Sequence, residues 1–207
     1  SACLVGSEMC IRDRAYTMAC GGGVCIPQPG TTQQLDSLGD RLMFRLAYRN
    51  FTDHESLVVS HSVMTSKAAG ERWYEIRDPN GTPKVYQQGT FTNGGNSLWM
   101  GSIDMDKAGD MAFGYSESNA STLHPSIAFT GRVPTDPLNT MESPATIFIA
   151  KGSAIGANRW GDYSSMVIDP SDDCTFWYIN QYIPKTAKNN FLTLHTRVAS
   201  LKFPTCQ

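Results

Sequence analysis

Charge is scarce in this sequence of 207 residues, because Asp, Glu, Lys and Arg together make up only 17% of it and the formal net charge is −2. A nucleic-acid-binding protein needs a basic surface for the phosphates, so the composition argues against that class. No run reaches the roughly 18–20 apolar residues that span a bilayer. No segment keeps a 3.6-residue apolar period over three turns. Helical bundles, membrane helices and nucleic-acid partners are therefore not expected.

The sequence instead has short runs of β-forming residues separated by turn residues. The turns include DPNG at 78–81 and DPSDD at 169–173, whose residues favour turn dihedrals. Turn signals at this spacing, without helices, predict an all-β sandwich, barrel or propeller. The expected strands lie at 41–49, 56–63, 72–77, 84–88, 99–104, 110–116, 126–132, 146–150, 164–169, 175–181 and 194–203.

The first fourteen residues, SACLVGSEMCIRDR, differ from the rest of the chain. Reverse translation of Leu4 to Asp13 gives, among the allowed codons, a string similar to a transposase-type adapter of sequencing libraries, and the flanking Cys3 and Arg14 fit the same frame. A signal peptide is the alternative, but the segment lacks an apolar core of the required length. We expect residues 1–14 to be an adapter-derived, non-native segment, and the native N-terminal part of the protein to be missing.

Cysteine usage points to the compartment. Without the two cysteines of the adapter-like segment, four remain, and an even number fits two disulfides and an oxidising compartment. A zinc site is the alternative, but it favours C-x-x-C pairs or nearby His, and the spacing C-GGGV-C does not fit. The predicted pairs are Cys20–Cys25 and Cys174–Cys206, and the predicted location is secreted or on the cell surface.

An internal repeat narrows the fold. Asp106–Tyr115 aligns without gaps with Asp169–Tyr178, and both copies run from an acidic turn into an aromatic strand. We expect hairpins whose Asp side chains accept hydrogen bonds from turn N–H groups and whose aromatics pack between sheets. Units of roughly 50–65 residues with about four strands are typical of propeller blades.

The predicted fold is a partial, sialidase-like β-propeller of about three four-stranded antiparallel blades. Residues 15–40 are expected to form an extended lead-in, and residues 41–207 the C-terminal blades. Propellers close with four or more blades, so missing N-terminal blades of the same protein are the first expected partner.

Several longer runs carry a family resemblance. They are RLAYRNFTDHESLVVSHSV at 45–63, RWYEIRDPNG at 72–81, VYQQGTF at 85–91, the stretch from RWGDYSS at 159 to DPSDDCTFWY at 169–178, and TRVASLKFPTC at 196–206. Together they resemble a group of large exported bacterial proteins with a sialidase-like propeller region. The resemblance covers nearly everything after residue 15, and it implies a fold and a location but no activity.

Sialidase chemistry needs an arginine cluster, a Tyr activated by an acid and an acidic proton donor. Two neighbour pairs, Tyr74–Glu75 and Asp162–Tyr163, combine a Tyr with an acid, but adjacent residues of a strand point to opposite faces. A non-catalytic binding or scaffolding module for a carbohydrate or cell-surface polymer is therefore favoured. The alternative is a glycoside hydrolase that shares its active site with the missing blades. The ligand-binding candidates are Arg72, Arg132, Arg159, Trp160, Asp162 and Tyr163.

Metal sites and tryptophans allow further expectations. Asp104, Asp106 and Asp110 lie on a glycine-containing turn, but Tyr115 stands where a calcium loop has its Glu. No cofactor is therefore expected, with calcium as the alternative. The histidines show no metal-ligand spacing. Trp177 is expected to pack between sheets, and Trp160 to line the mouth of a channel.

Overall fold

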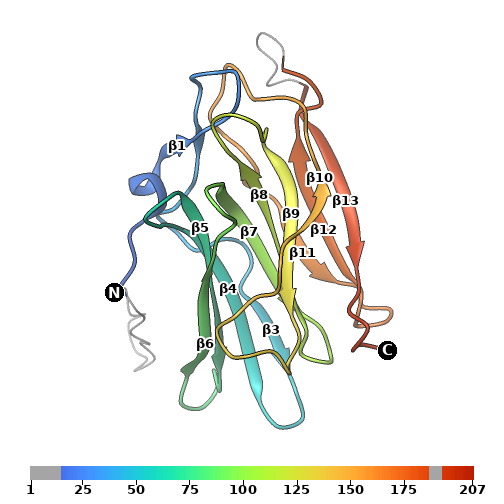
Figure 1. Cartoon of the computed structure of the whole chain (residues 1–207). Helices are drawn as coiled ribbons and strands as arrows, with labels where there is room; N and C mark the ends of the chain where they lie inside the picture. The colour runs from blue at the N-terminus through green and yellow to red at the C-terminus, as the bar shows by residue number, and fades with distance from the viewer. Residues whose placement is uncertain (1–14, 187–192) are drawn as a thin grey trace.

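The computed structural model describes residues 15–186 and 193–207, and these form an all-β protein (Figure 1). The all-β prediction is confirmed. A short 3-10 helix, η1 (Ala19–Gly22), precedes the first strand. The strands are β1 (Val24–Ile26), β2 (Leu35–Asp36), β3 (Ala47–Asn50), β4 (Glu55–Met64), β5 (Ala69–Arg77), β6 (Lys84–Phe91), β7 (Ser97–Met105), β8 (Met111–Ser118), β9 (Ser126–Arg132), β10 (Ala145–Phe148), β11 (Ser165–Ile168), β12 (Phe176–Tyr182) and β13 (His195–Leu201).

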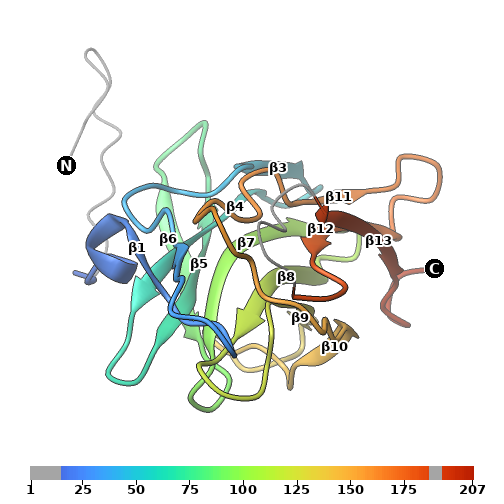
Figure 2. The same ribbon diagram turned by 90° about the horizontal axis from the view of Figure 1, so that it is seen from above.

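The strands form four antiparallel sheets, each made of strands that follow one another in the chain. A small pair joins β1 to β2. The first large sheet holds β3–β6, the second β7–β10 and the third β11–β13. Viewed from above, the three large sheets follow one another across the molecule in chain order (Figure 2). Turn residues between neighbouring strands explain this order, because short turns force antiparallel pairing of sequence neighbours.

Two segments near the start of the described chain depart from the predictions. The alternation at 41–49 predicts a strand, but β3 begins only at Ala47, and Leu42, Phe44 and Leu46 are exposed. Alternation alone is misleading there because no sheet buries these apolar side chains. The expected lead-in at 15–40 contains the unpredicted pair β1–β2, in which Val24 lies opposite Asp36.

Apolar side chains fill the spaces between the large sheets. Between the first and second sheets, Trp73 packs with Ile103 and Phe113, and between the second and third sheets, Tyr178 packs with Ile127. Each such side chain contributes roughly 1.5–3 kcal/mol when it leaves water. Contacts between side chains of neighbouring sheets therefore hold the three sheets together.

Both copies of the repeat form the predicted hairpins. Asp106 Oδ1 accepts hydrogen bonds from the backbone N–H groups of Ala108 (2.8 Å) and Asp110 (3.0 Å). In the second copy, Asp169 Oδ1 accepts one from Ser171 N (2.8 Å). Two aromatic residues on each return strand are buried: Phe113 and Tyr115 in the first copy, and Phe176 and Tyr178 in the second.

The predicted disulfide pairing is confirmed. Cys20 of η1 is bonded to Cys25 of β1, and Cys174, in the β11–β12 turn, is bonded to Cys206 after β13. The second bond ties the end of the described chain to the third sheet. Among the described residues, no helix has both the length and the apolar character that crossing a membrane requires.

Candidate functional site

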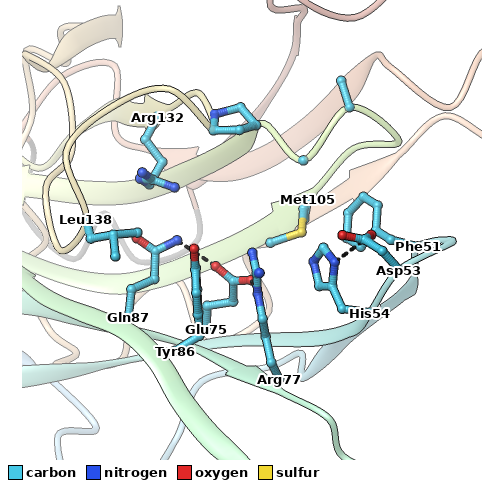
Figure 3. A pocket seen from close by; sticks show the side chains of 13 residues that line it. Phe51, Asp53, His54, Glu75, Arg77, Tyr86, Gln87, Met105, Arg132 and Leu138 are labelled. Atoms are coloured by element: carbon cyan, nitrogen blue, oxygen red, sulfur yellow. Dashed lines mark hydrogen bonds and ion pairs between the residues drawn. The ribbon is translucent and has the colours of Figure 1, made fainter.

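A cavity of about 270 Å³ lies at one end of the interface between the first and second sheets (Figure 3). Four parts of the chain form its walls: the β3–β4 hairpin, the β5–β6 hairpin, the β7–β8 turn, and the end of β9 with the segment that follows it. The polar side chains of the lining come mainly from β5, β6 and the end of β9. The larger apolar side chains of the lining are Phe51, Met105, Pro134 and Leu138.

Strand register explains why one end of this interface is polar. Along β5, Trp73, Glu75 and Arg77 share the face that looks toward the second sheet, because side chains alternate along a strand. Trp73 packs against Ile103 and Met105 of β7, but β7 ends at Met105. The face that carries Glu75 and Arg77 thus extends past the apolar core and borders the cavity.

Glu75 is the buried acid of this site. Only 1% of the residue is exposed, and its carboxylate accepts three hydrogen bonds. The donors are Ser56 Oγ (2.8 Å), Arg77 Nε (2.6 Å) and Gln87 Nε2 (2.5 Å). A carboxylate held by three donors is fixed in place.

Arg77 connects this acid to an aromatic ring. Its guanidinium carbon lies 3.4 Å from the centre of the Tyr86 ring, in a cation–π arrangement. The ion pair with Glu75 and the stacking on Tyr86 together fix the plane of the guanidinium. Arg77, Glu75, Tyr86 and Gln87 therefore form one rigid wall of the cavity (Figure 3).

Arg132, at the end of β9, lies on the opposite wall (Figure 3). It is 2% exposed, and it donates from Nε to Thr140 O (3.2 Å) and from Nη2 to Asp136 O (3.0 Å). Burial lowers the pKa of Arg132, although the charges of Asp136 and Glu75 act in the opposite direction. Within the described chain no carboxylate forms an ion pair with it. A buried cation whose partners are carbonyl groups is an unusual and costly arrangement.

His54 and Asp53 lie at the other end of the cavity. His54 Nδ1 is 2.8 Å from Asp53 Oδ1, and the His54 ring stacks on Phe51 with centroids 4.7 Å apart. The hydrogen bond from His54 holds the pKa of Asp53 below its usual range. The Asp53 side chain is 82% exposed, so its charge faces solvent more than it faces the cavity.

The three arginines named from the sequence do not come together. Only Arg132 borders this cavity. Arg72 lies on the opposite face of β5 from Glu75, and it donates to Thr90 Oγ1 and Gln88 Oε1, both at 2.9 Å. Arg159 forms an ion pair with Asp162 in the segment before β11. The convergence that sialidase chemistry needs is absent from the part of the chain that the structure describes.

The remaining ligand-binding candidates from the sequence are Trp160, Asp162 and Tyr163. They line a separate depression near β11. Tyr163 is 91% exposed there, and Asp162 is paired with Arg159. Trp160 borders the same depression but is only 1% exposed, and its Nε1 donates to Ser116 Oγ (3.1 Å). Its environment is that of a packed core residue and not that of a channel mouth.

Trp177, in contrast, is more exposed than the sequence predicts. The repeat pattern predicts that it packs between sheets, but it is 41% exposed and its Nε1 donates to Asp169 Oδ2 (2.9 Å). Its face of the third sheet has no further described sheet against it. A pattern that repeats in sequence therefore does not guarantee the same burial, because burial depends on the neighbouring sheet.

Sequence reasoning missed most of the polar side chains of the lining, namely Asp53, His54, Arg77, Tyr86 and Gln87. Glu75 was considered only with its neighbour Tyr74, and the structure confirms that the two side chains face opposite sides, since Tyr74 Oη contacts His61 Nε2 (3.0 Å). The sequence offers one signal for this site. Glu75 and Arg77 are two positions apart on the strand, so they lie on the same face of β5 as Trp73. The long connection between β9 and β10 gives no such signal.

Among the described residues, no three or more His, Cys, Asp or Glu side chains are grouped so that they could hold a metal ion. Comparisons with protein-family models, with curated proteins and with solved structures found no match to this chain. The geometry of the cavity is therefore the basis for a functional proposal.

Proposed function

We propose that the chain is part of a sialidase-like β-propeller region in an exported protein, and that this region binds a carbohydrate without cleaving it. The observation that carries the proposal is the cavity between the first two sheets, where Arg132 is buried without a carboxylate partner. Two disulfides support export, because such bonds persist in oxidising compartments. Three successive antiparallel sheets support the propeller assignment.

The arrangement of the acids favours binding over hydrolysis. Glycoside hydrolysis needs a pair of groups, two carboxyls or a Tyr with an acid, that face one scissile bond. Glu75 is held in place by three donors, and Asp53 is paired with His54 and points to solvent. Tyr86 has the Arg77 guanidinium over its ring. These groups are positioned to hold a ligand and not to transfer protons to it.

A cavity-blocking variant tests the location of binding. Ala108 lines the cavity from the β7–β8 turn, and its side chain is exposed, so Ala108→Trp should fill the entrance without disturbing the core. A panel of neutral and acidic oligosaccharides would be titrated calorimetrically into the wild type and this variant. We expect binding in the wild type and its loss in Ala108→Trp.

Thr32→Trp is the matched control, because Thr32 is exposed and lies in the β1–β2 connection, away from the cavity. It should bind as the wild type does. Equal binding by both variants would place the ligand elsewhere and overturn the proposal.

A second measurement tests the absence of hydrolysis. Mass spectrometry of an oligosaccharide that binds, after prolonged incubation with the protein, should show the intact ligand only. Release of a sugar by the wild type, together with its loss in Glu75→Gln, would instead support the glycoside hydrolase alternative.

A further inference from the structure

We propose that the outer face of the third sheet binds a flat, neutral polysaccharide chain, with the Trp177 ring stacked on one of its sugar units. The outer face is the side of β11, β12 and β13 that points away from the second sheet. It lies apart from the cavity, so it gives the protein a second contact with carbohydrate and does not depend on the first.

Strand register defines the outer face. Tyr178 packs on the second sheet, and side chains alternate along a strand, so its neighbours Trp177 and Ile179 point to the other side. The third sheet is the last of the row, and no described sheet lies against this side (Figure 2). A depression of about 290 Å³ lies on it. The residues of the outer face are Ser165, Val167, Trp177, Ile179, Gln181, Thr196, Val198 and Ser200.

None of these side chains carries a formal charge. The charged residues near the two ends of the face are held by partners of their own, since Asp172 pairs with Lys202, and Arg159 pairs with Asp162 beside Gln181. Binding surfaces match their partners in charge. A face without charge cannot compensate an ionic ligand for the water it loses, so the face suits a neutral ligand.

The identity of residue 177 argues against a further sheet as the occupant. The matching residue of the second sheet is Gly114, and a Cβ atom there would lie 2.5 Å from the ring of Tyr178. The third sheet therefore approaches the second so closely only because residue 114 has no side chain. Trp177 places the largest side chain at the same point of the third sheet, which prevents an equally close approach.

The size of the face argues against a second copy of the chain. Strands lie about 4.8 Å apart and rise about 3.3 Å per residue, so three strands offer an area on the order of 300 Å², with 7 residues each in β12 and β13. A stable protein–protein interface buries about 800 Å² on each partner. The outer face alone is too small for that, whereas a single polysaccharide chain needs only a narrow strip.

The Trp177 ring is held in place before any ligand arrives. Its Nε1 donates to Asp169 Oδ2 (2.9 Å), while 41% of the residue remains exposed. A side chain that is fixed beforehand loses little conformational entropy on binding. The sugar units of cellulose and chitin are neutral, and their polar groups lie around the ring edge, so C–H groups cover both ring faces. Such a face packs on an aromatic ring and buries apolar surface.

Polar side chains at the margins of the face complete the match. Ser200 lies opposite Trp177 and Ser165 lies opposite Ile179, so hydroxyl groups flank the apolar residues on both neighbouring strands. Hydroxyl and amide groups can both donate to and accept from sugar hydroxyls. Gln181, farther along β12, also borders the depression in which Tyr163 is 91% exposed. A chain that runs along β12 from Trp177 therefore reaches a second exposed aromatic residue.

Retention on insoluble polysaccharides tests the proposal. The protein would be mixed with microcrystalline cellulose, with chitin and with granular starch, whose coiled chains present no flat ribbon. We expect cellulose, chitin or both to retain the wild type and starch not to, and the first two probes separate the two sources of a flat neutral chain. Raising the salt concentration should leave retention unchanged, because the contact carries no charge. No retention on either cellulose or chitin, or retention that salt abolishes, would overturn the proposal.

Variants assign the retention to the ring. Trp177→Ala should weaken it about tenfold or more, and Trp177→Phe should keep part of it, because phenylalanine retains an aromatic ring. Tyr48→Ala is the matched control, since Tyr48 is a 52% exposed aromatic residue of β3 in the first sheet, and it should be retained as the wild type is. Circular dichroism checks that each variant is folded. Undiminished retention of folded Trp177→Ala would contradict the proposal.

Tryptophan fluorescence gives a readout that needs no variant. Trp73, Trp99 and Trp160 are at most 1% exposed, so emission from exposed tryptophan comes from Trp177. Saturating cellohexaose, a soluble fragment of cellulose, should shift this emission to shorter wavelength and protect it from quenching by acrylamide. Trp177→Phe should show neither change. Unchanged emission of the wild type in saturating cellohexaose would count against the stacked ring.

The outcomes separate this proposal from the proposed function. Ala108→Trp fills the cavity and should be retained on the polysaccharide as the wild type is. If Ala108→Trp abolishes retention and Trp177→Ala does not, the proposed function stands and the outer face is not a binding surface. If retention depends on Trp177 and no sugar binds in a manner that Ala108→Trp blocks, the reverse holds. A dimer that Trp177→Ala dissociates, seen by analytical ultracentrifugation, would show that protein covers the face and would overturn the proposal.

Discussion

The two copies of the acidic turn, at 106–115 and 169–178, share one sequence pattern but lie in different surroundings. In the first copy Asp106 and Asp110 are both completely buried. In the second copy Asp173 pairs with Arg49 of β3 and Asp172 pairs with Lys202, near solvent. The local hydrogen bonds from turn N–H groups to the Asp side chains recur in both. The comparison shows that a short motif sets the shape of a hairpin, while its neighbours set the electrostatics.

The strands that leave the two turns also differ. Gly114 in the first copy aligns with Trp177 in the second. A Cβ atom at Gly114 would lie 2.5 Å from the ring of Tyr178, so only glycine permits the third sheet to approach. At the matching position of the third sheet, Trp177 is 41% exposed. The first copy is therefore covered by a neighbouring sheet at this position, whereas the second copy is not. This difference should affect stability and its dependence on pH.

The largest expected effect on the free energy of unfolding concerns the disulfide of the second copy, since the first copy contains no cysteine. Cys174–Cys206 joins residues 32 positions apart, whereas Cys20–Cys25 joins residues 5 apart. The loss of loop-closure entropy in the unfolded chain predicts that Cys174→Ala/Cys206→Ala lowers the free energy of unfolding by about 4 kcal/mol. The matched variant Cys20→Ala/Cys25→Ala should lower it by about 2 kcal/mol. Urea denaturation measures both, and an equal loss would mean that the second copy does not depend on its disulfide.

The next effect concerns the covered copy. Gly114→Ala places a methyl group against the Tyr178 ring, so we expect overpacking to lower the free energy of unfolding by about 3 kcal/mol. Gly95→Ala is the control, because a Cβ there has no atom within 4 Å, and its effect should stay within about 0.5 kcal/mol. Similar values for the two variants would show that the second and third sheets do not pack as closely as this contact requires.

The sequence was informative about the fold because turns and strands leave local signals. The strand Ser126–Arg132 has the predicted bounds, and the hairpins of both repeats form where the acidic turns indicate. The β1–β2 pair was missed because its strands are very short. Leu42, Phe44 and Leu46 show the reverse error, since they alternate as a strand does but remain exposed.

The candidate site was much harder to predict. Arg132 was named from the sequence, but its partners Thr140 and Asp136 act through backbone carbonyls, which any residue type supplies. The sequence does not distinguish Arg132, which borders the cavity, from Arg72 and Arg159, which do not. The face of the sheet on which an arginine lies depends on strand register, and its burial depends on what packs against that face. Trp160 and Trp177 were interchanged for the same reason.

The two copies should also respond to pH in opposite directions. Burial, with the nearby Asp110 charge, raises the pKa of Asp106 to about 6 from an ordinary value of 3.8. The fold therefore favours the protonated form, and this contribution to stability is present below about pH 4 and lost as the pH rises through 6. Asp106→Asn mimics the protonated form, so its melting temperature relative to the wild type should increase between pH 4 and pH 7.

Asp172 is the contrasting case. Hydrogen bonds from the backbone N–H groups of Thr175 and Cys174 lower the pKa of Asp172. Its contribution is present above the ordinary pKa and is lost in acid, so Asp172→Asn should be most destabilising near neutral pH and less so as the pH falls. Melting curves across this range test both variants, and slopes of the same sign would contradict the comparison.

The smallest expected effect concerns the uncovered face. Trp177 borders an apolar depression with Val167, Ile179 and Val198, and its Nε1 donates a hydrogen bond to Asp169. Since much of the ring is already in solvent, Trp177→Ala should lower the free energy of unfolding by about 1 kcal/mol or less. The buried Trp99, which is 0% exposed, is the reference, and Trp99→Ala should cost about 3–5 kcal/mol. A loss at Trp177 as large as that at Trp99 would mean that another surface covers this face in solution, and the two copies of the repeat would then be alike in burial after all.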